Sequence, residues 1–384
     1  MTNDQTTTAT TSTAPPKRVE TIVVGAGQTG LATAYHLTRA GRECLVLHEH
    51  ARVGDQWRER YDSLHLNTPA KYDSLPGMRF PAKRFAFPTG RAMGDYLETY
   101  ADTMGLSVRG DTHVVSVDRL PEGGWRVSAE DATFLADNVI VGTGGEHHPK
   151  VPAFAGRLDP GIRQIHSHDY RNPGQLLPGP VLVVGAGQSG ADIALELADA
   201  GHETVLSGTV NGEVPIRIES LRGHLAAPVL WFLANHVLTL RTPVGRKAQA
   251  RVRAGGTPLV RVKRADLAAA GVDHTESRTE GVRDGRPSLA DGRTLDVANV
   301  VWCTGFRQDF SFIHPAVTGP DGWPTDRGGV MADSPGLFFV GLLFQRGFYS
   351  MLIGGAGRDA AHIARQIVAR RTRAGQQQGA LTPA

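Results

Sequence analysis

Two glycine-rich segments of the chain have the residue types and spacing needed to hold a pyrophosphate. They span residues 21–30 and 181–190, and each carries Gly-x-Gly-x-x-Gly between an apolar run and a stretch with helical spacing. In such a turn the first glycine permits the bend, the second lets phosphates approach the backbone, and the third lets helix and strand pack closely. The positive N-terminus of the helix then faces the anion. The residues expected in these turns are Gly25, Gly27, Gln28 and Gly30, and Gly185, Gly187, Gln188, Ser189 and Gly190.

The residues that follow the second strand of each unit indicate which dinucleotide that unit binds. Glu49 lies 19 residues after Gly30, where a ribose hydroxyl needs an acceptor, so the first site is expected to take an adenine dinucleotide. The equivalent strand of the second unit ends at Ser207 without a carboxylate, and Arg217 follows ten residues later. This pattern favours NADPH over NADH, because a 2′-phosphate needs hydroxyls and positive charge. The alternative is that Ser207 only ends a strand and Arg217 is a solvated surface charge.

Two dinucleotide sites on one chain also suggest which cofactors they hold. A nicotinamide supplies hydride, and the bound nucleotide able to receive it is a flavin. We therefore expect FAD in the first site and NADPH in the second.

The pattern of apolar runs predicts an α/β fold with two Rossmann-like domains, the first of them discontinuous. Each glycine turn opens a strand, helix, glycine, strand unit. An antiparallel hairpin is expected at residues 114–127, and a buried strand with a Thr-Gly turn at residues 138–144 has an echo at residues 299–305. The chain then returns through a strand at residues 335–341 and a helix from residue 358 to about residue 370.

The length of 384 residues suits two domains of moderate size. The boundaries expected are a disordered tail at 1–18, an FAD-binding domain at 19–150 and 300–371, an inserted NADPH-binding domain at 151–299, and a loose tail at 372–384.

Composition excludes several classes of protein. The 41 basic and 38 acidic residues nearly balance, which argues against a nucleic-acid partner. The longest apolar stretch, residues 225–240, is too short and too interrupted for a transmembrane segment, so the cytoplasm is the expected location. Only two cysteines occur, and they stand far apart, so no disulfide framework or redox pair is available. His166 and His168 fit no standard zinc spacing, and no metal is expected. A homodimer remains open.

Four further segments resemble one family. They are residues 54–57 (Gly-Asp-Gln-Trp), 66–68 (Leu-Asn-Thr), 166–170 (His-Ser-His-Asp-Tyr) and 303–306 (Cys-Thr-Gly-Phe). Together with both glycine turns they resemble the flavin-containing monooxygenases, or class B flavoprotein monooxygenases, and their bacterial relatives, over residues 21–367. The chain departs from the family pattern in three places: Asp55 replaces the second glycine of Gly-Gly-x-Trp, and Pro160 and Ile162 replace the Phe and Gly of the linker signature. Tyr170 ends that signature as in the amine-, sulfide- or auxin-related branches, which argues against a Baeyer–Villiger enzyme.

The resemblance implies a monooxygenase that uses molecular oxygen and a small, apolar organic substrate. NADPH reduces FAD, and the reduced flavin forms a C4a-(hydro)peroxide that transfers one oxygen atom while the protein excludes water. Asn67 is the expected catalytic residue beside flavin and nicotinamide, unless it only forms a turn before Pro69. Trp57 is expected beside the flavin, and His166 in the linker that shapes closure. The remaining cofactor contacts are expected at Gln56, Val114, Thr143, Gly144, Thr304, Gly305, Gly341 and Leu342.

Other readings remain open at this point. The chain could be a reductase that passes electrons to a quinone or a protein, or a nucleotide-sensing regulatory protein without turnover. Residues 221–264 are explained by neither nucleotide fold. We expect them to form either an apolar lid over the substrate entrance or an amphipathic helix packed on the second domain.

Overall fold

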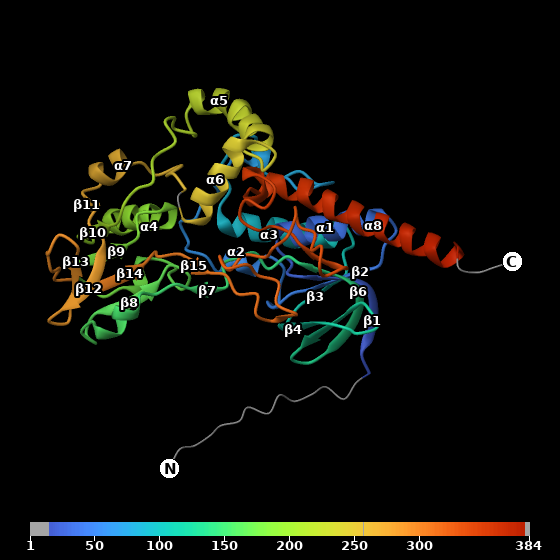
Figure 1. Cartoon of the computed structure of the whole chain (residues 1–384). Coiled ribbons are helices and arrows are strands. Elements are labelled where there is room, and N and C mark those ends of the chain that lie inside the picture. The colour runs from blue at the N-terminus through green and yellow to red at the C-terminus, as the bar shows by residue number, and fades with distance from the viewer. Residues whose placement is uncertain (1–14, 256, 381–384) are drawn as a thin grey trace, which may run out of the picture.

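The computed structural model describes residues 15–255 and 257–380, with side chains described up to residue 370, and it folds as two α/β units. Each unit has a sheet of its own, and Figure 1 shows the sheet with β9 and β14 at the left and the sheet with β1 and β6 at the lower right. Among these residues no helix is long and apolar enough to cross a bilayer.

The first sheet has the order β16-β4-β5-β6-β1-β2-β3, and β17 pairs with β6 as well. Strands β1, β2, β3, β6 and β17 form its parallel part, whereas β4 and β5 form the antiparallel hairpin expected between the two glycine turns. Its strands are β1 (Lys17–Val24), β2 (Cys44–Leu47), β3 (Val108–Arg109), β4 (Val114–Arg119), β5 (Trp125–Ala129), β6 (Thr133–Val141), β16 (Ile313–His314) and β17 (Leu337–Phe339). Because β16 and β17 come from the end of the chain, this domain is discontinuous, as expected.

The second sheet is inserted between β6 and β16, and all its strands run parallel in the order β11-β10-β9-β14-β8. They are β8 (Arg163–His166), β9 (Val181–Val184), β10 (Thr204–Ser207), β11 (Asp273–Thr275) and β14 (Asn299–Trp302). A separate hairpin of β12 (Thr279–Arg283) and β13 (Arg286–Leu289) follows β11. The chain crosses between the domains through β7 (His148–Pro149) and β15 (Phe306–Arg307), which pair antiparallel.

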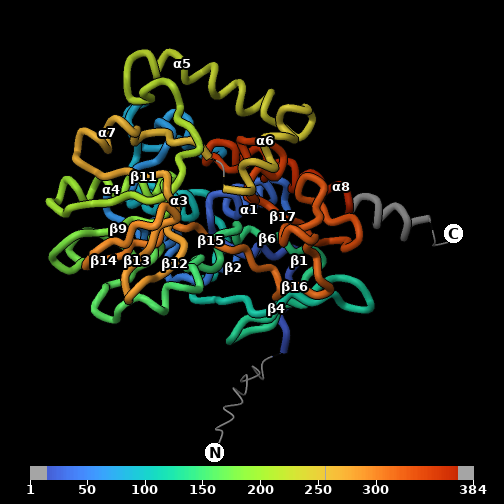
Figure 2. The backbone as a smooth tube through the Cα atoms, turned by 60° about the vertical axis from the view of Figure 1, so that its left-hand side comes forward, coloured from blue at the N-terminus to red at the C-terminus, as the bar shows by residue number. Residues whose placement is uncertain are grey.

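Helices cover the sheets. The first domain contributes α1 (Gln28–Arg39), α2 (Asp55–Arg58), α3 (Gly90–Thr103) and α8 (Ala356–Ala380), and the second contributes α4 (Gln188–Asp199) and α7 (Arg264–Ala269). Between α4 and α7 the inserted chain also forms α5 (Leu221–Phe232) and α6 (Pro243–Arg253), which contact the first domain. A π-helix, η4 (Leu233–Val237), continues α5. Figure 2 shows α5 running along the top of the molecule, above α6 and the ends of both domains.

The alternation of side chains along the central strands explains the layers. Successive residues of a strand point to opposite faces, so a strand buried on both sides is apolar throughout. In β1, Val23 packs with Leu31 of α1 and Ile363 of α8 on one face, while Ile22 packs with Val139 on the other. The apolar runs beside each glycine turn therefore lie in the centre of their sheets.

Two expected boundaries differ from the structure. Lys17 and Arg18 of β1 pair with Phe134 and Leu135 of β6, so β1 begins before residue 18, the expected end of the tail. Residues 1–14 lie outside the described part. At the other end α8 continues to Ala380, past the expected end near residue 370. Its last turns are rich in Arg, Gln and Ala, which favour helix without an apolar face to signal it.

Candidate functional site

The first glycine turn leaves the start of α1 free for an anion. Gly27 is the N-cap residue, no described side chain caps the helix, and its first turn carries no acidic residue. The N–H groups at a helix start need partners and carry partial positive charge. A phosphate there would satisfy both demands.

The three glycines of this turn are required for different reasons. Gly25 has a φ of +105°, and a Cβ there would lie 2.7 Å from the carbonyl oxygen of Gly142. A Cβ on Gly30 would overlap the carbonyl oxygen of Gly25. At Gly27 the backbone is ordinary extended chain, and the nearest described atom to a Cβ would be Nε2 of Gln56, 4.0 Å away. The fold therefore requires glycine at the first and third positions, whereas the second position has room for a larger side chain.

The side chain above Gly27 also lacks a partner. Oε1 of Gln56 is buried and makes no hydrogen bond within the described structure. A buried amide oxygen without a partner is costly. The open space and the unpaired amide together fit a bound dinucleotide at this turn.

The second turn repeats this arrangement. A Cβ on Gly185 would overlap the carbonyl oxygen of Cys303, and one on Gly190 would overlap that of Gly185. Gly187 has no described atom within 4 Å of its Cβ position and caps α4 without help from a side chain. Each turn thus rests on the segment after its neighbouring strand, at residues 142–143 in the first domain and 303–304 in the second, and leaves its middle glycine open.

Glu49 lies two residues beyond β2, next to the segment that leads into β4. Its carboxylate is 3.5 Å from His50 and 3.6 Å from His113, and its side chain is 61% exposed. Hydrogen bonding to His50, aided by the charges of His50 and His113, lowers the pKa of Glu49 to about 2. It is therefore an ionised acceptor near neutral pH. Since His113 directly precedes Val114, Glu49 lies close to the start of β4, and a contact of Glu49 and Val114 with an adenosine stays a prediction.

Other expected cofactor residues lie around the first turn in different ways. Gly341 has a φ of +77°, and a Cβ there would lie 2.8 Å from Oγ1 of Thr29 in α1. Leu342, which follows it, points into the core, so only its backbone can reach a ligand. Oγ1 of Thr143 lies 3.0 Å from Nε2 of His147. Trp57 packs, half-buried, against the core of the first domain.

The departure at Asp55 has a local explanation. Gly54 keeps its left-handed conformation with a φ of +94°, and a Cβ there would collide with the backbone of Gly94. Asp55 is the first residue of α2, and its carboxylate accepts a hydrogen bond of 2.8 Å from Arg58. The turn therefore keeps its essential glycine, and the aspartate adds an ion pair within the helix.

Asn67 lies at the contact between the two domains. Its Nδ2 donates to Oε1 of Gln188, the first residue of α4. Nearby, the hydroxyl of Tyr61 donates to Asp192 of the same helix over 3.0 Å, and the Tyr61 ring is buried in the core of the second domain. Tyr61 and Asn67 of the first domain therefore contact the helix that begins at the second glycine turn.

The expected ligands of a 2′-phosphate are placed differently. Ser207 is buried, and its hydroxyl donates to the carbonyl of Ser277 over 2.8 Å and accepts from Thr279 over 2.9 Å. The chain that follows β11 covers the end of β10 and engages this hydroxyl, and a contact between Ser207 and a 2′-phosphate stays a prediction. Arg217 is exposed and pairs with Asp266 of α7.

A residue that the sequence reasoning missed lies closer to the end of β10. Arg264, 46% exposed, places Nη2 3.4 Å from the carbonyl of Val210, three residues after Ser207. It also lies 3.3 Å from Glu276 and 3.7 Å from Glu213. Arg264 follows β10 by more than fifty residues, so local spacing gave no signal for it.

His166 belongs to the crossing between the domains. Its Nε2 lies 3.1 Å from the carbonyl of Gly305, and its Nδ1 accepts from the backbone N–H of His168 over 3.1 Å. Burial lowers its pKa. Thr304 donates to the carbonyl of Lys150 across the same crossing. Both ring nitrogens of His166 thus have partners, which favours a role in fixing the linker over a role in the reaction.

The described residues contain no group of three His, Cys, Asp or Glu side chains that could hold a metal ion.

The two thiols are poorly suited to redox chemistry. Cys44 lies in β2 of the first sheet, and Cys303 follows β14 of the second. Burial raises the pKa of each thiol to about 12, so neither is a thiolate at neutral pH.

Helices α5 and α6 of the segment at residues 221–264 contact the first domain, whereas Leu259 of the same segment lies in the core of the second domain. Trp231 stacks on Tyr72 with ring centres 4.6 Å apart. Farther along, Nε2 of Gln249 donates to the carbonyl of Phe344 over 3.0 Å. The outer side of α5 carries exposed apolar side chains, among them Leu221, Leu225, Val229 and Phe232.

Comparison with known proteins agrees with this geometry. The family model described as pyridine nucleotide-disulphide oxidoreductase matches residues 22–213. An uncharacterized CzcO-like oxidoreductase of Geobacillus kaustophilus (strain HTA426) is 34% identical over 351 residues, which cover 91% of this chain and 98% of the relative. The probable indole-3-pyruvate monooxygenase YUCCA9 of Arabidopsis thaliana is 27% identical, over 90% of this chain and 88% of its own.

A solved structure shows the same similarity. A flavin-containing monooxygenase from Stenotrophomonas maltophilia aligns with a TM-score of 0.70 and 26% identity, over 92% of this chain and 99% of that one. The resemblance expected from the short motifs is thereby confirmed along almost the whole chain. This chain belongs to the pyridine nucleotide-disulphide oxidoreductase family, and it is an oxidoreductase of the FAD- and NAD(P)-dependent type, similar to flavin monooxygenases.

Proposed function

We propose that this protein is an NADPH-dependent flavin monooxygenase that transfers one oxygen atom from molecular oxygen to a small organic substrate. The observation that carries the proposal is the pair of glycine turns whose middle glycines have room for a ligand, together with the contact between Asn67 of the first domain and Gln188 of the second turn. The first turn, with Glu49 and Gln56, would hold FAD. The second would hold NADPH.

The bound flavin would supply the electron transfer and the oxygen activation. The chain's own residues would position the two nucleotides and keep water out. Asn67 would offer its amide where the cofactors meet, and Tyr61 would hold α4 against the first domain through Asp192. Arg264 would supply positive charge beside the 2′-phosphate.

Two observations bear on the alternatives. A disulfide reductase needs a reactive thiol pair, and of the only two cysteines of the chain Cys44 lies in β2 of the first sheet and Cys303 follows β14 of the second. A reductase that delivers electrons to another acceptor stays the second candidate, because the relative from Geobacillus is named only as an oxidoreductase. A regulatory protein would keep both turns without steady turnover.

Isotope labelling separates these functions. The FAD-loaded protein is given NADPH and ¹⁸O₂ with panels of amines, sulfides, ketones and organic acids, and the products are analysed by mass spectrometry. A monooxygenase consumes one NADPH and one ¹⁸O₂ per turnover and leaves one ¹⁸O atom in the product and the other in water. If a quinone accelerates NADPH oxidation and no substrate acquires ¹⁸O, the protein is a reductase, and the proposal fails.

A further inference from the structure

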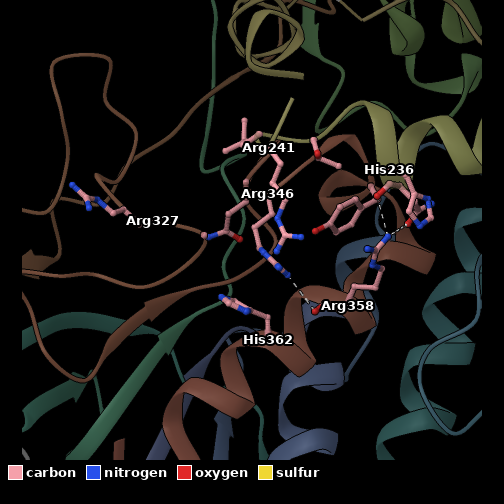
Figure 3. A pocket seen from close by; sticks show the side chains of 12 residues that line it. His236, Arg241, Arg327, Arg346, Arg358 and His362 are labelled. Carbon is pink, nitrogen blue, oxygen red and sulfur yellow. Dashed lines mark hydrogen bonds between the residues drawn. The ribbon is translucent and has the colours of Figure 1, made fainter. Parts of the chain in front are cut away.

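A cavity of about 390 Å³ lies outside both glycine turns, between η4 and the residues after it, the loop at residues 345–349 and the start of α8. Figure 3 shows Arg346 near its centre, with Arg327 on one side and His236 and Arg358 on the other. Arg241 and His362 complete its basic lining. Its size lies within the range of small-molecule sites.

The positive charge of this cavity is largely unbalanced. No acidic residue lines it. Behind it, Asp359 lies 3.0 Å from Arg346, with a side chain that is only 2% exposed. For the exposed residues Arg241, Arg327 and Arg358, no carboxylate lies within 4 Å in the described part of the chain, so three solvent-accessible guanidinium groups line the cavity without a counter-charge. Like charges held together this way favour a bound anion.

A histidine in the lining responds to the same field. Burial first, and then the charges of Arg346, Arg365 and Arg241, lower the pKa of His362 to about 4. His362 is therefore neutral near pH 7, and its ring can donate one hydrogen bond without adding charge.

The walls of the cavity are held in place by contacts between distant segments. The N–H of Leu240 donates to the carbonyl of Arg346 over 3.0 Å, and the N–H of Phe348 donates to that of Leu238 over 2.8 Å. Nη1 of Arg358 donates to Oδ1 of Asn235 over 2.7 Å. Asn235 lies in the π-helix η4, an irregularity frequent at functional sites. The guanidinium groups of Arg346 and Arg358 are thus fixed before any ligand arrives, which lowers the entropic cost of binding.

We propose that this cavity binds a small organic carboxylate. The planar guanidinium fork matches a carboxylate through two parallel hydrogen bonds. Leu240 and the ring of Tyr349 supply apolar wall for an organic body. None of the residues of the two glycine turns lines the cavity, so the site is additional to those proposed for FAD and NADPH. The acid could be the substrate of the oxidoreductase or an effector, and these two sources share the same chemistry.

The probe is benzoate, with benzamide as a neutral ligand of the same shape and inorganic phosphate as a simple anion. Binding to the full-length, FAD-loaded protein is measured by calorimetry at low ionic strength. The test variant is Arg241→Gln, and the matched control is Arg251→Gln, an exposed arginine of α6 outside the cavity. Neither side chain makes an ion pair within the described residues, so both variants are expected to fold.

Benzoate should bind at least tenfold more tightly than benzamide, and Arg241→Gln should weaken it at least tenfold while Arg251→Gln leaves it unchanged. Bound benzoate should also raise the pKa of His362, followed by NMR. Equal binding of benzoate and benzamide, equal loss in both variants, or phosphate binding as tightly as benzoate would overturn the proposal. Oxygenated product from an acid in the cavity would identify a substrate, and a changed NADPH oxidation rate with the acid recovered intact would identify an effector.

Discussion

Replacing Gly27 by alanine separates a glycine that serves a ligand from one that serves the fold. In the free protein the added methyl group meets nothing closer than Nε2 of Gln56, at 4.0 Å, and the backbone is one that alanine adopts readily. The same holds at Gly187, where no described atom lies within 4 Å. At Gly30 the methyl group would overlap the carbonyl oxygen of Gly25.

The expected magnitudes follow from these contacts. A methyl group on Gly27 would push a bound pyrophosphate away from the N–H groups of α1, and a hydrogen bond to a charged group contributes about 1.5–3 kcal/mol. Losing one weakens binding roughly 10- to 150-fold. The unfolding free energy should change by less than about 1 kcal/mol, because alanine is a poorer N-cap than glycine but restricts the unfolded chain.

The assay compares three variants. Gly27→Ala should bind FAD more weakly, measured as flavin absorbance per protein and as the Kd of reconstitution. Without FAD, its Tm should lie within a few degrees of the Tm of the parent without FAD. Gly187→Ala should keep its FAD and raise the KM for NADPH by about tenfold or more. Gly30→Ala should lower the Tm whether or not FAD is present. If Gly27→Ala binds FAD like the parent, the open space at this turn does not face the pyrophosphate, and the reasoning is wrong.

Three further changes test individual side chains. Asn67→Ala should increase severalfold the share of NADPH electrons released as hydrogen peroxide, at unchanged FAD content, because the contact between the domains through Gln188 is lost. If the share released as hydrogen peroxide stays the same, Asn67 only forms a turn. Arg264→Gln should raise the KM for NADPH about tenfold and leave the KM for NADH nearly unchanged. Arg217→Gln, which loses a contact with Asp266, should leave both KM values nearly unchanged. A larger rise of the KM for NADPH in Arg217→Gln than in Arg264→Gln would favour Arg217 as the phosphate ligand. Burial raises the pKa of Asp73 to about 7 in the folded protein. The folded state therefore holds this proton more tightly than the unfolded chain does. The resulting stabilisation is complete below the ordinary pKa of an aspartate and is lost as the pH rises to about 7. Asp73→Asn should therefore gain about 3 kcal/mol of unfolding free energy relative to the parent between pH 5 and pH 8, measured by denaturant titration, and a pH-independent difference would contradict it.

Local patterns predicted the parts of the fold that local physics decides. Each glycine turn needs a bend, a close helix and a buried strand within thirty residues, and all three leave marks in the sequence around Gly25 and Gly185. The spacing of apolar residues alone predicted the hairpin of β4 and β5. It also predicted the strands before and after each glycine-turn helix, which are β1 with β2 and β9 with β10. Even the echo of the two Thr-Gly turns has a structural counterpart, since each lies against its own glycine loop.

The residues around the sites depended on contacts that sequence spacing does not encode. Ser207 has the right position after β10, but the segment after β11, some seventy residues later, occupies its hydroxyl. Arg264 reaches the same region from α7. The basic cavity joins Arg241 of the inserted segment to Arg346 and His362 of the last part of the chain. The basic cavity therefore forms only when the two domains meet, whereas the contacts of Ser207 and Arg264 lie within the second domain.

This dependence on the domain contact connects the proposed sites to one another. The inserted segment leaves the second domain, packs Trp231 on Tyr72 and pairs with the loop that carries Arg346. The same domain presents Gln188 to Asn67 at the second glycine turn. Any rotation of the second domain about the crossing of β7 and β15 must therefore change both contacts together. A carboxylate that bridges Arg241 and Arg346 would hold the domains in the arrangement in which Asn67 meets Gln188, so its binding and that of NADPH should strengthen each other by the same factor.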